Sequence, residues 1–232
     1  MKRVDKEHPT PARPCDRGNS LVRDTQGGER PRRLEGRALD QLLAEIRACK
    51  ICEAHLPLGP RPVLQAMASS RLLIVGQAPG RKVHMSGIPF DDVSGDRLRA
   101  WLGVDRTLFY DARRIAIVGM GFCFPGSARG GDLPPRPECA PTWHPRLLPM
   151  LTRVRLTLAI GQYAQTGLLG KRRGRTLTDT VLAWRTHLAN GVLPLPHPSP
   201  RNRVWLTRNP WFETELLPVL REHVAGLLGD GA

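Results

Sequence analysis

The sequence lacks any apolar run approaching the roughly 20 residues that a membrane-spanning helix needs. Its N-terminus carries charges and prolines where a secretory signal peptide would have its apolar segment. A long basic amphipathic helix of the kind that lies on membrane surfaces is also missing. These absences predict a cytoplasmic protein that does not bind a membrane.

Basic side chains are abundant instead. Lys and Arg number 35 against 21 Asp and Glu, which gives a formal net charge of +14 over 232 residues. This excess predicts a polyanionic partner, and nucleic acid is the favoured one because no membrane-binding helix is present. A genome that encodes arginine in preference to lysine is the other explanation, since arginine enrichment raises the isoelectric point without any ligand.

The chain divides into a tail and one folded domain. The first 36 residues are rich in Pro, Gly and mixed charge and have almost no apolar periodicity, so they cannot bury enough surface to offset their ordering entropy. We expect a disordered basic tail over residues 1–36 and a single domain over 37–232. Apolar residues at helical spacing from Leu39 to Ile46 predict a helix that leads to Cys49.

Four short apolar runs predict strands that are buried on both faces. They are LLIVGQA from Leu72, RIAIVGM from Arg114, LTLAIGQ from Leu156 and VLPLPH from Val192. Helical stretches between them, with N-caps expected at Ser94, Thr178 and Asn209, predict a three-layer α/β/α fold around a central, mostly parallel four-stranded sheet. Ligands of such sheets bind beyond the carboxyl ends of the strands, so GQAPG (76–80) and HPSPRN (197–202) should share one cleft.

Four of the five cysteines have a suggestive spacing. Cys49 and Cys52 form a C-x-x-C pair, and Cys123 and Cys139 follow with fifteen residues between them, while Cys15 lies in the tail and is expected to be free. In a cytosolic protein this pattern favours a metal site or redox pair over a disulfide. Four thiolates satisfy a zinc ion or a [4Fe–4S] cluster equally well by count. The wide second spacing favours the cluster, with zinc as the alternative, because structural zinc sites usually take two close pairs.

His197 stands at the end of the last predicted strand, among three prolines. Pro196, Pro198 and Pro200 fix backbone angles around it and remove N–H donors. We therefore expect a loop that holds its shape and aims the imidazole in a fixed direction.

Three motifs, taken in order, resemble the uracil-DNA glycosylase superfamily. They are GQAPG after the first strand, Gly87-Ile88-Pro89-Phe90 followed by Ser94-Gly95, and HPS after the last strand. The closest resemblance is to its iron–sulfur group, called family 4, whose cysteine layout matches all four spaced cysteines, and it spans about residues 38–228. It implies a [4Fe–4S] cluster on Cys49, Cys52, Cys123 and Cys139. It also implies a DNA glycosylase of base excision repair that excises uracil or another deaminated base from single- or double-stranded DNA.

The resemblance assigns roles to the motif residues. Phe90 should stack on the flipped base, which is worth roughly 1–3 kcal/mol, and His197 should donate a hydrogen bond to the leaving base, worth about 3 kcal/mol. The expected base-binding residues are Gly76, Ala78, Pro79, Gly80, Phe90 and Gly119. The expected DNA contacts are Ser94, Ser199, Pro200, Arg201, Asn202 and Arg203, with a second basic cluster at Lys171, Arg172 and Arg173. The loop Arg201, Asn202, Arg203, Val204 and Trp205 offers cations for phosphates and a wedge for the space that a flipped base leaves.

Two departures from the family pattern bear on catalysis. Gln77 stands where the family usually has Glu, and an amide contacts a base or a water but is not a general base. We expect Asp91 and Asp92 to supply the missing charge. The family also has an Asn on the strand that leads to the third cysteine, but residues 117–122 contain no amide. Three alternatives explain the missing amide. Main-chain groups near Gly119 recognise the base instead, or the pocket binds another deaminated base, or the protein has lost catalytic activity.

Three functions follow, of which a monofunctional glycosylase is the leading one. No lysine occupies a motif position, so we expect no β-lyase step. The second is a glycosylase-like module that binds deaminated or abasic DNA without efficient cleavage, and Gln77 and the missing Asn keep it open. The third, an iron–sulfur redox protein or sensor, rests on the cysteines alone and leaves the three motifs unexplained. We expect a monomer.

Overall fold

A computed structural model describes residues 29–229, with side-chain surroundings from residue 36 onward. Predictions for residues 1–28, including a free Cys15, lie outside this range. A helix, α1 (Glu29–Arg47), opens the described part and ends just before Cys49, as expected. This helix begins before residue 36, where the sequence predicts the domain boundary. The sequence did not reveal its first turns, because they carry no apolar periodicity.

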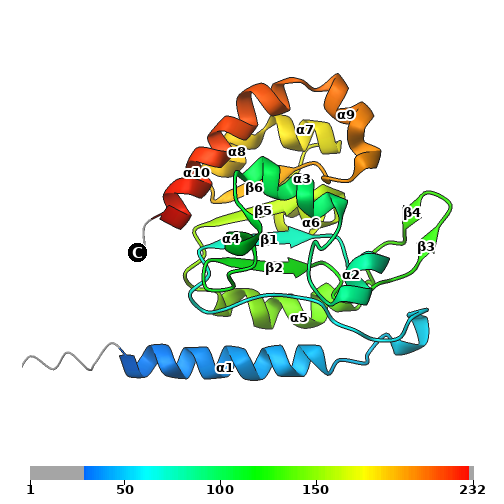
Figure 1. Cartoon of the computed structure of the whole chain (residues 1–232), viewed down its shortest axis with the longest axis vertical. Helices are drawn as coiled ribbons and strands as arrows, with labels where there is room; N and C mark the ends of the chain where they lie inside the picture. Colours follow the sequence, from blue (N-terminus) through cyan, green and yellow to red (C-terminus); the bar gives the residue numbers. More distant parts are fainter. Residues whose placement is uncertain (1–28, 230–232) are drawn as a thin grey trace, which may run out of the picture.

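The four predicted strands form one sheet. They are β1 (Leu72–Gly76), β2 (Ile115–Gly119), β5 (Leu156–Ile160) and β6 (Val192–Leu195), in the order β2-β1-β5-β6. Every neighbouring pair is parallel, and Gly76 lies beside Gly119 where β1 and β2 end. The predicted mostly parallel four-stranded sheet is confirmed, and its carboxyl ends share one edge (Figure 1).

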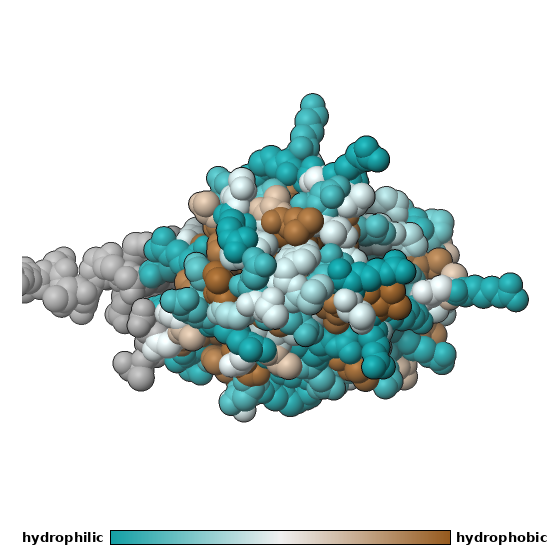
Figure 2. Space-filling view, turned by 90° about the horizontal axis from the view of Figure 1, so that it is seen from above, coloured by the Kyte–Doolittle hydropathy of each residue, from teal (hydrophilic) through white to brown (hydrophobic). Residues whose placement is uncertain are grey.

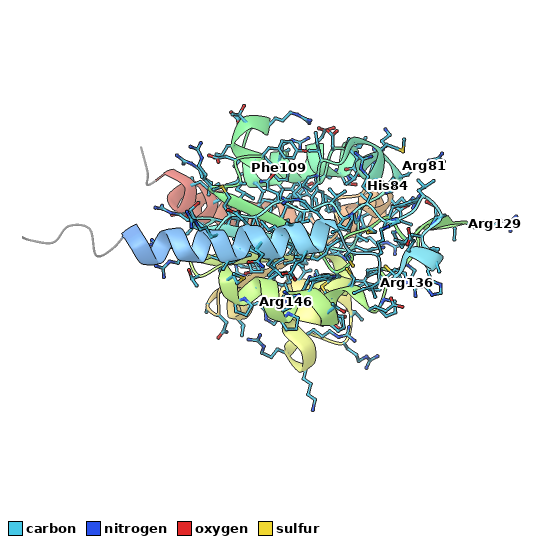
Figure 3. All side chains as sticks on the ribbon, turned by 90° about the horizontal axis from the view of Figure 1, so that it is seen from below. Arg81, His84, Phe109, Arg129, Arg136 and Arg146 are labelled. Carbon is cyan, nitrogen blue, oxygen red and sulfur yellow. The ribbon has the colours of Figure 1, made fainter. Side chains whose placement is uncertain are left out.

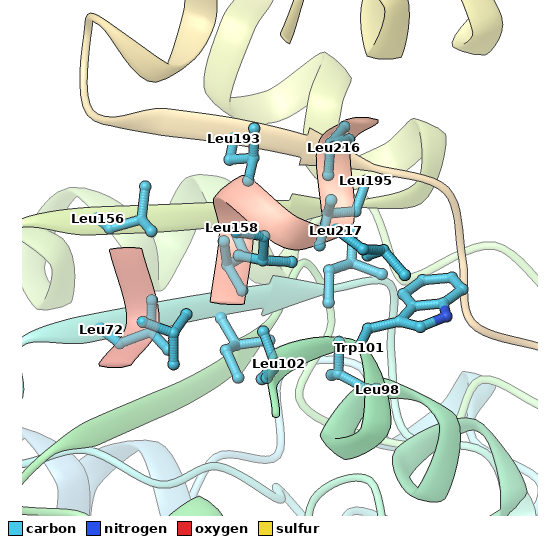
Figure 4. Close-up of a cluster of buried hydrophobic side chains, with 14 of the residues drawn as sticks. Leu72, Leu98, Trp101, Leu102, Leu156, Leu158, Leu193, Leu195, Leu216 and Leu217 are labelled. Carbon is cyan, nitrogen blue, oxygen red and sulfur yellow. The ribbon is translucent and has the colours of Figure 1, made fainter. Parts of the chain in front are cut away.

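Side chains of each strand alternate between two hydrophobic cores, one on each face of the sheet. Leu72 and Ile74 face the core built with α3 (Val93–Leu102), α7 (Leu177–Leu182), α8 (Trp184–Leu188) and α10 (Leu217–Gly229), part of which Figure 4 shows. Leu73 and Val75 face the core built with α1, α5 (Cys139–Leu147) and α6 (Gly161–Leu169). This alternation explains why all of β1 is apolar, and it confirms the α/β/α layers.

The remaining elements are short. They are α2 (Arg81–Ser86), α4 (Arg106–Phe109), α9 (Arg203–Arg208), 3-10 turns at Glu53–His55, Leu148–Met150, Gly170–Arg172 and Pro200–Asn202, and a π-helical segment at Phe212–Leu216 that runs into α10. A small antiparallel hairpin of β3 (Ser127–Ala128) and β4 (Gly131–Asp132) projects from the body of the molecule (Figure 1).

The expected helix N-caps were wrong in position. Asp92, not Ser94, caps α3, since its Oδ1 accepts the N–H of Gly95 at 2.9 Å. Likewise Thr176, not Thr178, caps α7, in a reciprocal capping box with Asp179. An N-cap side chain accepts from an N–H two or three residues later, so the polar residue before the first turn takes the role. Asn209 ends α9 instead of starting the long helix.

The surface seen in Figure 2 is mostly hydrophilic, and hydrophobic residues occur on it in small separate groups. Between residues 29 and 229, no helix is long and apolar enough to span a bilayer.

Buried histidines make a pH dependence of stability expected. Burial lowers the pKa of His84, His144 and His187 below the usual value. Below about pH 6.5, these histidines take up protons in the unfolded chain but not in the folded chain. The free energy of unfolding therefore has its full value above this pH and decreases as the pH falls. Urea unfolding should give a lower free energy of unfolding at pH 5.5 than at pH 7.5.

A matched pair of variants tests this cause. His187→Gln should weaken the pH dependence, because burial lowers the pKa of His187 and glutamine takes up no proton in this pH range. His223→Gln changes an exposed histidine of α10 and should leave the dependence as it is. Equal stability of the unchanged protein at the two pH values would contradict the expectation.

Candidate functional site

A cavity of about 730 Å³ opens at the carboxyl edge of the sheet. Its wall combines the ends of β1 and β2, the start of α3, the β3–β4 hairpin, Gln162 at the start of α6 and the loop after β6. Residues of GQAPG and of HPSPRN both line it, which confirms that the two distant motifs share one cleft. Its volume lies in the range of small-molecule sites, roughly 300–1,000 Å³.

Phe90 forms an aromatic wall of this cavity. Its ring lies against Gly76, where a side chain would begin 3.2 Å from the ring, and meets Phe109 edge-on at 6.4 Å between centroids. The backbone of Phe90 has φ +55, a conformation uncommon outside glycine. The Tyr110 hydroxyl donates to the Phe90 carbonyl oxygen at 3.3 Å, which helps to hold this strained turn.

Gly95 lets this turn exist. A Cβ at Gly95 would overlap the carbonyl oxygen of Phe90, which is backbone and has little freedom to move. We expect Gly95→Ala to lower the free energy of unfolding by about 1–3 kcal/mol, the usual cost of overpacking, and to displace the Phe90 ring. Urea unfolding measures the loss. Gly226→Ala, on α10 with open space around the added Cβ, is the control, and equal stability of the two variants would contradict the expectation.

The His197 loop is held by side chains from three other positions. Gln165 donates to the carbonyl oxygen of Leu195 at 2.9 Å, Asn202 to that of His197 at 2.7 Å, and Arg97 to that of Ser199 at 3.0 Å. Because the prolines leave few N–H groups for backbone pairing, these donors satisfy the carbonyl groups of the loop. The predicted fixed loop is therefore held by its prolines and by these hydrogen bonds.

The imidazole of His197 is arranged as a neutral donor. Its Nδ1 accepts the N–H of Ser199 at 3.2 Å, so the neutral ring carries its proton on Nε2. Burial lowers the pKa of His197, while the charges of Asp92 and Asp132 raise it by a smaller amount. A lowered pKa keeps the ring uncharged near neutral pH, and an Nε2–H donor remains for a ligand in the cavity.

The two expected catalytic carboxylates lie in different places. Asp91 is outside the large cavity, in an ion pair with Arg106 at 2.8 Å that lowers the pKa of this carboxyl group. Asp92 lines the cavity and caps α3 with one of its oxygens. The sequence could not separate the two, because adjacent residues in a turn point in different directions.

The polar groups near Gln77 and Gly119 are largely engaged in the fold. The Gln77 side-chain amide donates to the carbonyl oxygen of Leu133 at 3.1 Å. The N–H groups of Met120 and Gly121 donate to the carbonyl oxygens of Gly76 and Gln77, both at 2.9 Å. These two main-chain donors are not free for a base, which counts against main-chain reading at this place, although Gly119 itself lines the cavity.

The expected DNA contacts fall into two groups. Those that line the cavity are Ser94, Ser199, Pro200, Arg201 and Asn202. Arg203 begins α9, and Lys171, Arg172 and Arg173 follow the far end of α6, none of them lining the cavity. Within the loop expected to offer a wedge, Trp205 packs against Trp211 and Phe212 and donates to the Thr178 hydroxyl at 2.9 Å, whereas Val204 is exposed.

Two polar residues of the cavity were not expected from the sequence, Asp132 and Gln162. Gln162 directly follows Gly161 after a buried strand, so the rule that ligands bind beyond strand ends could have found it. Asp132 comes from the hairpin between the third and fourth spaced cysteines, a segment without periodicity, and no sequence signal identified it.

The four spaced cysteines come together elsewhere. Cys49, Cys52, Cys123 and Cys139 line one small second cavity, together with Arg136 and Trp143 among others. Burial raises the pKa of Cys123 to about 11 and that of Cys139 to about 12. In the described part of the chain, no group of three or more His, Cys, Asp or Glu side chains is positioned to hold a metal ion. The metal prediction therefore stays a prediction.

Fold and cavity together define an α/β protein with a ligand site at the carboxyl edge of a parallel sheet. A comparison with models of known protein families matches residues 65–221 to the uracil DNA glycosylase superfamily, and the chain belongs to this superfamily. The resemblance read from the motifs is confirmed at this level, and the iron–sulfur subgroup remains a prediction. Membership indicates a DNA glycosylase, an enzyme that hydrolyses N-glycosidic bonds and binds DNA.

Proposed function

We propose that this protein is a monofunctional glycosylase that releases uracil from DNA by base flipping, in base excision repair. The observation that carries the proposal is one cavity lined both by the Phe90 ring and by a histidine whose Nε2–H is free to donate. Extruding a nucleotide costs a few kcal/mol of unstacking, and stacking on an aromatic ring offsets much of this cost.

His197 acts on the bond that breaks. As the base leaves, negative charge grows on its carbonyl oxygen, and a neutral imidazole held in place stabilises that charge more than it stabilises the bound substrate. The sugar becomes cationic at the same time, and the carboxylates of Asp92 and Asp132 lie in the same cavity. Arg201, at the rim, is suited to contact a phosphate of the flipped strand.

The proposal includes a [4Fe–4S] cluster on Cys49, Cys52, Cys123 and Cys139. This ligand set is supported by two observations: four thiols from distant segments line one cavity, and the Phe122 N–H donates to the Cys139 sulfur at 3.3 Å. Bound there, the cluster would supply cross-links between α1, the loop after β2 and α5. Those links would fix the segment between Cys123 and Cys139, which contains the β3–β4 hairpin.

A binding module without efficient cleavage is the second candidate. It is favoured by the engaged main-chain donors of Met120 and Gly121 and by the absence of a general base at Gln77. Such a protein would hold a flipped or abasic nucleotide in the same cavity without breaking the N-glycosidic bond.

One assay separates the two candidates. Purified protein is incubated with single- and double-stranded oligonucleotides that carry uracil, hypoxanthine or xanthine, and strand breaks are counted before and after alkali. We expect breaks at uracil only after alkali, because a monofunctional enzyme leaves an intact abasic site. Tight binding of abasic DNA without breaks at any base would favour the binding module, and breaks before alkali would show a lyase step.

A further inference from the structure

The β3–β4 hairpin brings a carboxylate to the cavity that the motifs did not predict. Gly130, Gly131 and Asp132 line the cavity together with the HPSPRN loop. Arg201 of that loop donates to the carbonyl oxygen of Gly130 at 2.8 Å, and a Cβ on Gly131 would overlap the Arg201 guanidinium. The turn of the hairpin is thus docked on the HPSPRN loop, whereas the side chain of Arg129, in the same turn, points away from the body (Figure 3).

Asp132 is oriented from two sides. One carboxylate oxygen, Oδ1, accepts the Ser127 hydroxyl across the hairpin at 2.8 Å. The other, Oδ2, lies against the GQAPG turn, 3.1 Å from the point where a Cβ on Gly80 would stand. The Gln77 side chain donates to the carbonyl oxygen of Leu133, the residue after Asp132. Gln77 is not a general base itself, but it helps to hold the segment that carries the Asp132 carboxylate.

The neighbouring carboxylates are committed elsewhere. Asp91 is paired with Arg106 outside the cavity, and Asp92 holds the start of α3 through Gly95. We propose that Asp132 is a catalytic residue that accepts the proton of the attacking water through Oδ2. The assignment rests on the proposed glycosylase function and names the base that this function needs.

The step balances as a hydrolysis. The water oxygen bonds to the sugar C1′ while its proton passes to Asp132, and the electron pair of the C1′–N bond leaves with the base. The base oxygen accepts a hydrogen bond from His197 Nε2–H, and Asp132 later returns the proton to the departing base or to solvent. The charges of Asp132 and Asp92 both raise the pKa of His197 against the lowering by burial, so both carboxylates act within electrostatic range of the imidazole.

The experiment compares Asp132→Asn, Asp92→Asn and His197→Ala in single-turnover release of uracil and of 5-fluorouracil from otherwise identical oligonucleotides. Asparagine can keep the Ser127 contact at position 132, and it is as good an N-cap as aspartate at position 92. We expect Asp132→Asn to be at least about 100-fold slower with both bases, as for loss of a general base, and Asp92→Asn to lose less than about tenfold. His197→Ala should recover part of its loss with 5-fluorouracil, because the more acidic base needs less help to leave.

Binding of a duplex with an abasic-site analogue and the melting temperature are measured on every variant. The assignment is supported if Asp132→Asn releases both bases slowly but keeps its affinity for the abasic-site duplex and its melting temperature. A rate within threefold of the unchanged protein, while His197→Ala is slow, overturns it and leaves the glycosylase function intact. A loss of abasic-site binding as large as the loss in rate makes Asp132 a binding residue and also overturns it. No base release by the unchanged protein overturns the proposed function, and the assignment falls with it.

Discussion

His197→Ala should lower the single-turnover rate of uracil release by about 100- to 1000-fold, the usual effect of removing one fixed donor from a developing oxyanion. The structure supplies the physical reason. Nδ1 is occupied by the Ser199 N–H, so the ring has one free donor, and burial lowers the pKa of His197 so that the donor is a neutral N–H. Alanine removes this donor, while the prolines and the hydrogen bonds from Gln165, Asn202 and Arg97 still hold the loop.

The measurement is the rate of alkali-sensitive product at saturating enzyme, with His223→Ala as the matched control. His223 is an exposed histidine on α10 and does not line the cavity, so the control should retain the full rate. Affinity for an abasic-site duplex should change little in His197→Ala, since Phe90 and the rim of the cavity remain. A rate within threefold of the unchanged protein would remove His197 from the chemistry.

The architecture could be predicted because strands that are buried on both faces consist almost entirely of apolar residues. Leu72 to Val75 alternate between two cores, so the run is apolar throughout, and turn residues bound each such run. Parallel order then places GQAPG and HPSPRN at one edge, and this topological rule needs no side-chain detail. Phe90 and His197 were assigned from the family resemblance, since each belongs to one of its motifs, Gly87-Ile88-Pro89-Phe90 and HPS.

The roles of individual side chains could not be predicted, because they depend on where each side chain points in the fold. Asp91 and Asp92 look equivalent in the sequence, but one faces Arg106 and the other faces the cavity. Asp132 reaches the cavity through a hairpin whose docking depends on the Arg201 contact, a pairing about 70 residues apart in the chain. Trp205 lies in the same basic loop as Arg201, but it packs against Trp211 and Phe212, a contact that the sequence did not indicate.

Cys139→Ser should remove most of the bound iron and destabilise the domain. Cys139 is the first residue of α5 and lines the same cavity as the other three thiols, so a cluster there would tie α5 to the loop after β2 and to the end of α1. Because such a group binds the folded chain and not the unfolded one, its binding energy becomes folding energy. We expect a loss of several kcal/mol, or on the order of 10 °C in Tm for a domain of this size.

Iron and zinc are measured on anaerobically purified protein, together with the visible absorption and the thermal transition. Cys15→Ser is the matched control, since this cysteine was not expected to bind the cluster, and it should keep the iron, the brown colour and the Tm. Stoichiometric zinc in a colourless unchanged protein would replace the cluster by a zinc site on the same thiols. Full iron content in Cys139→Ser would show instead that the ligand set is wrong, because serine provides no thiolate at the start of α5 to complete four sulfur ligands.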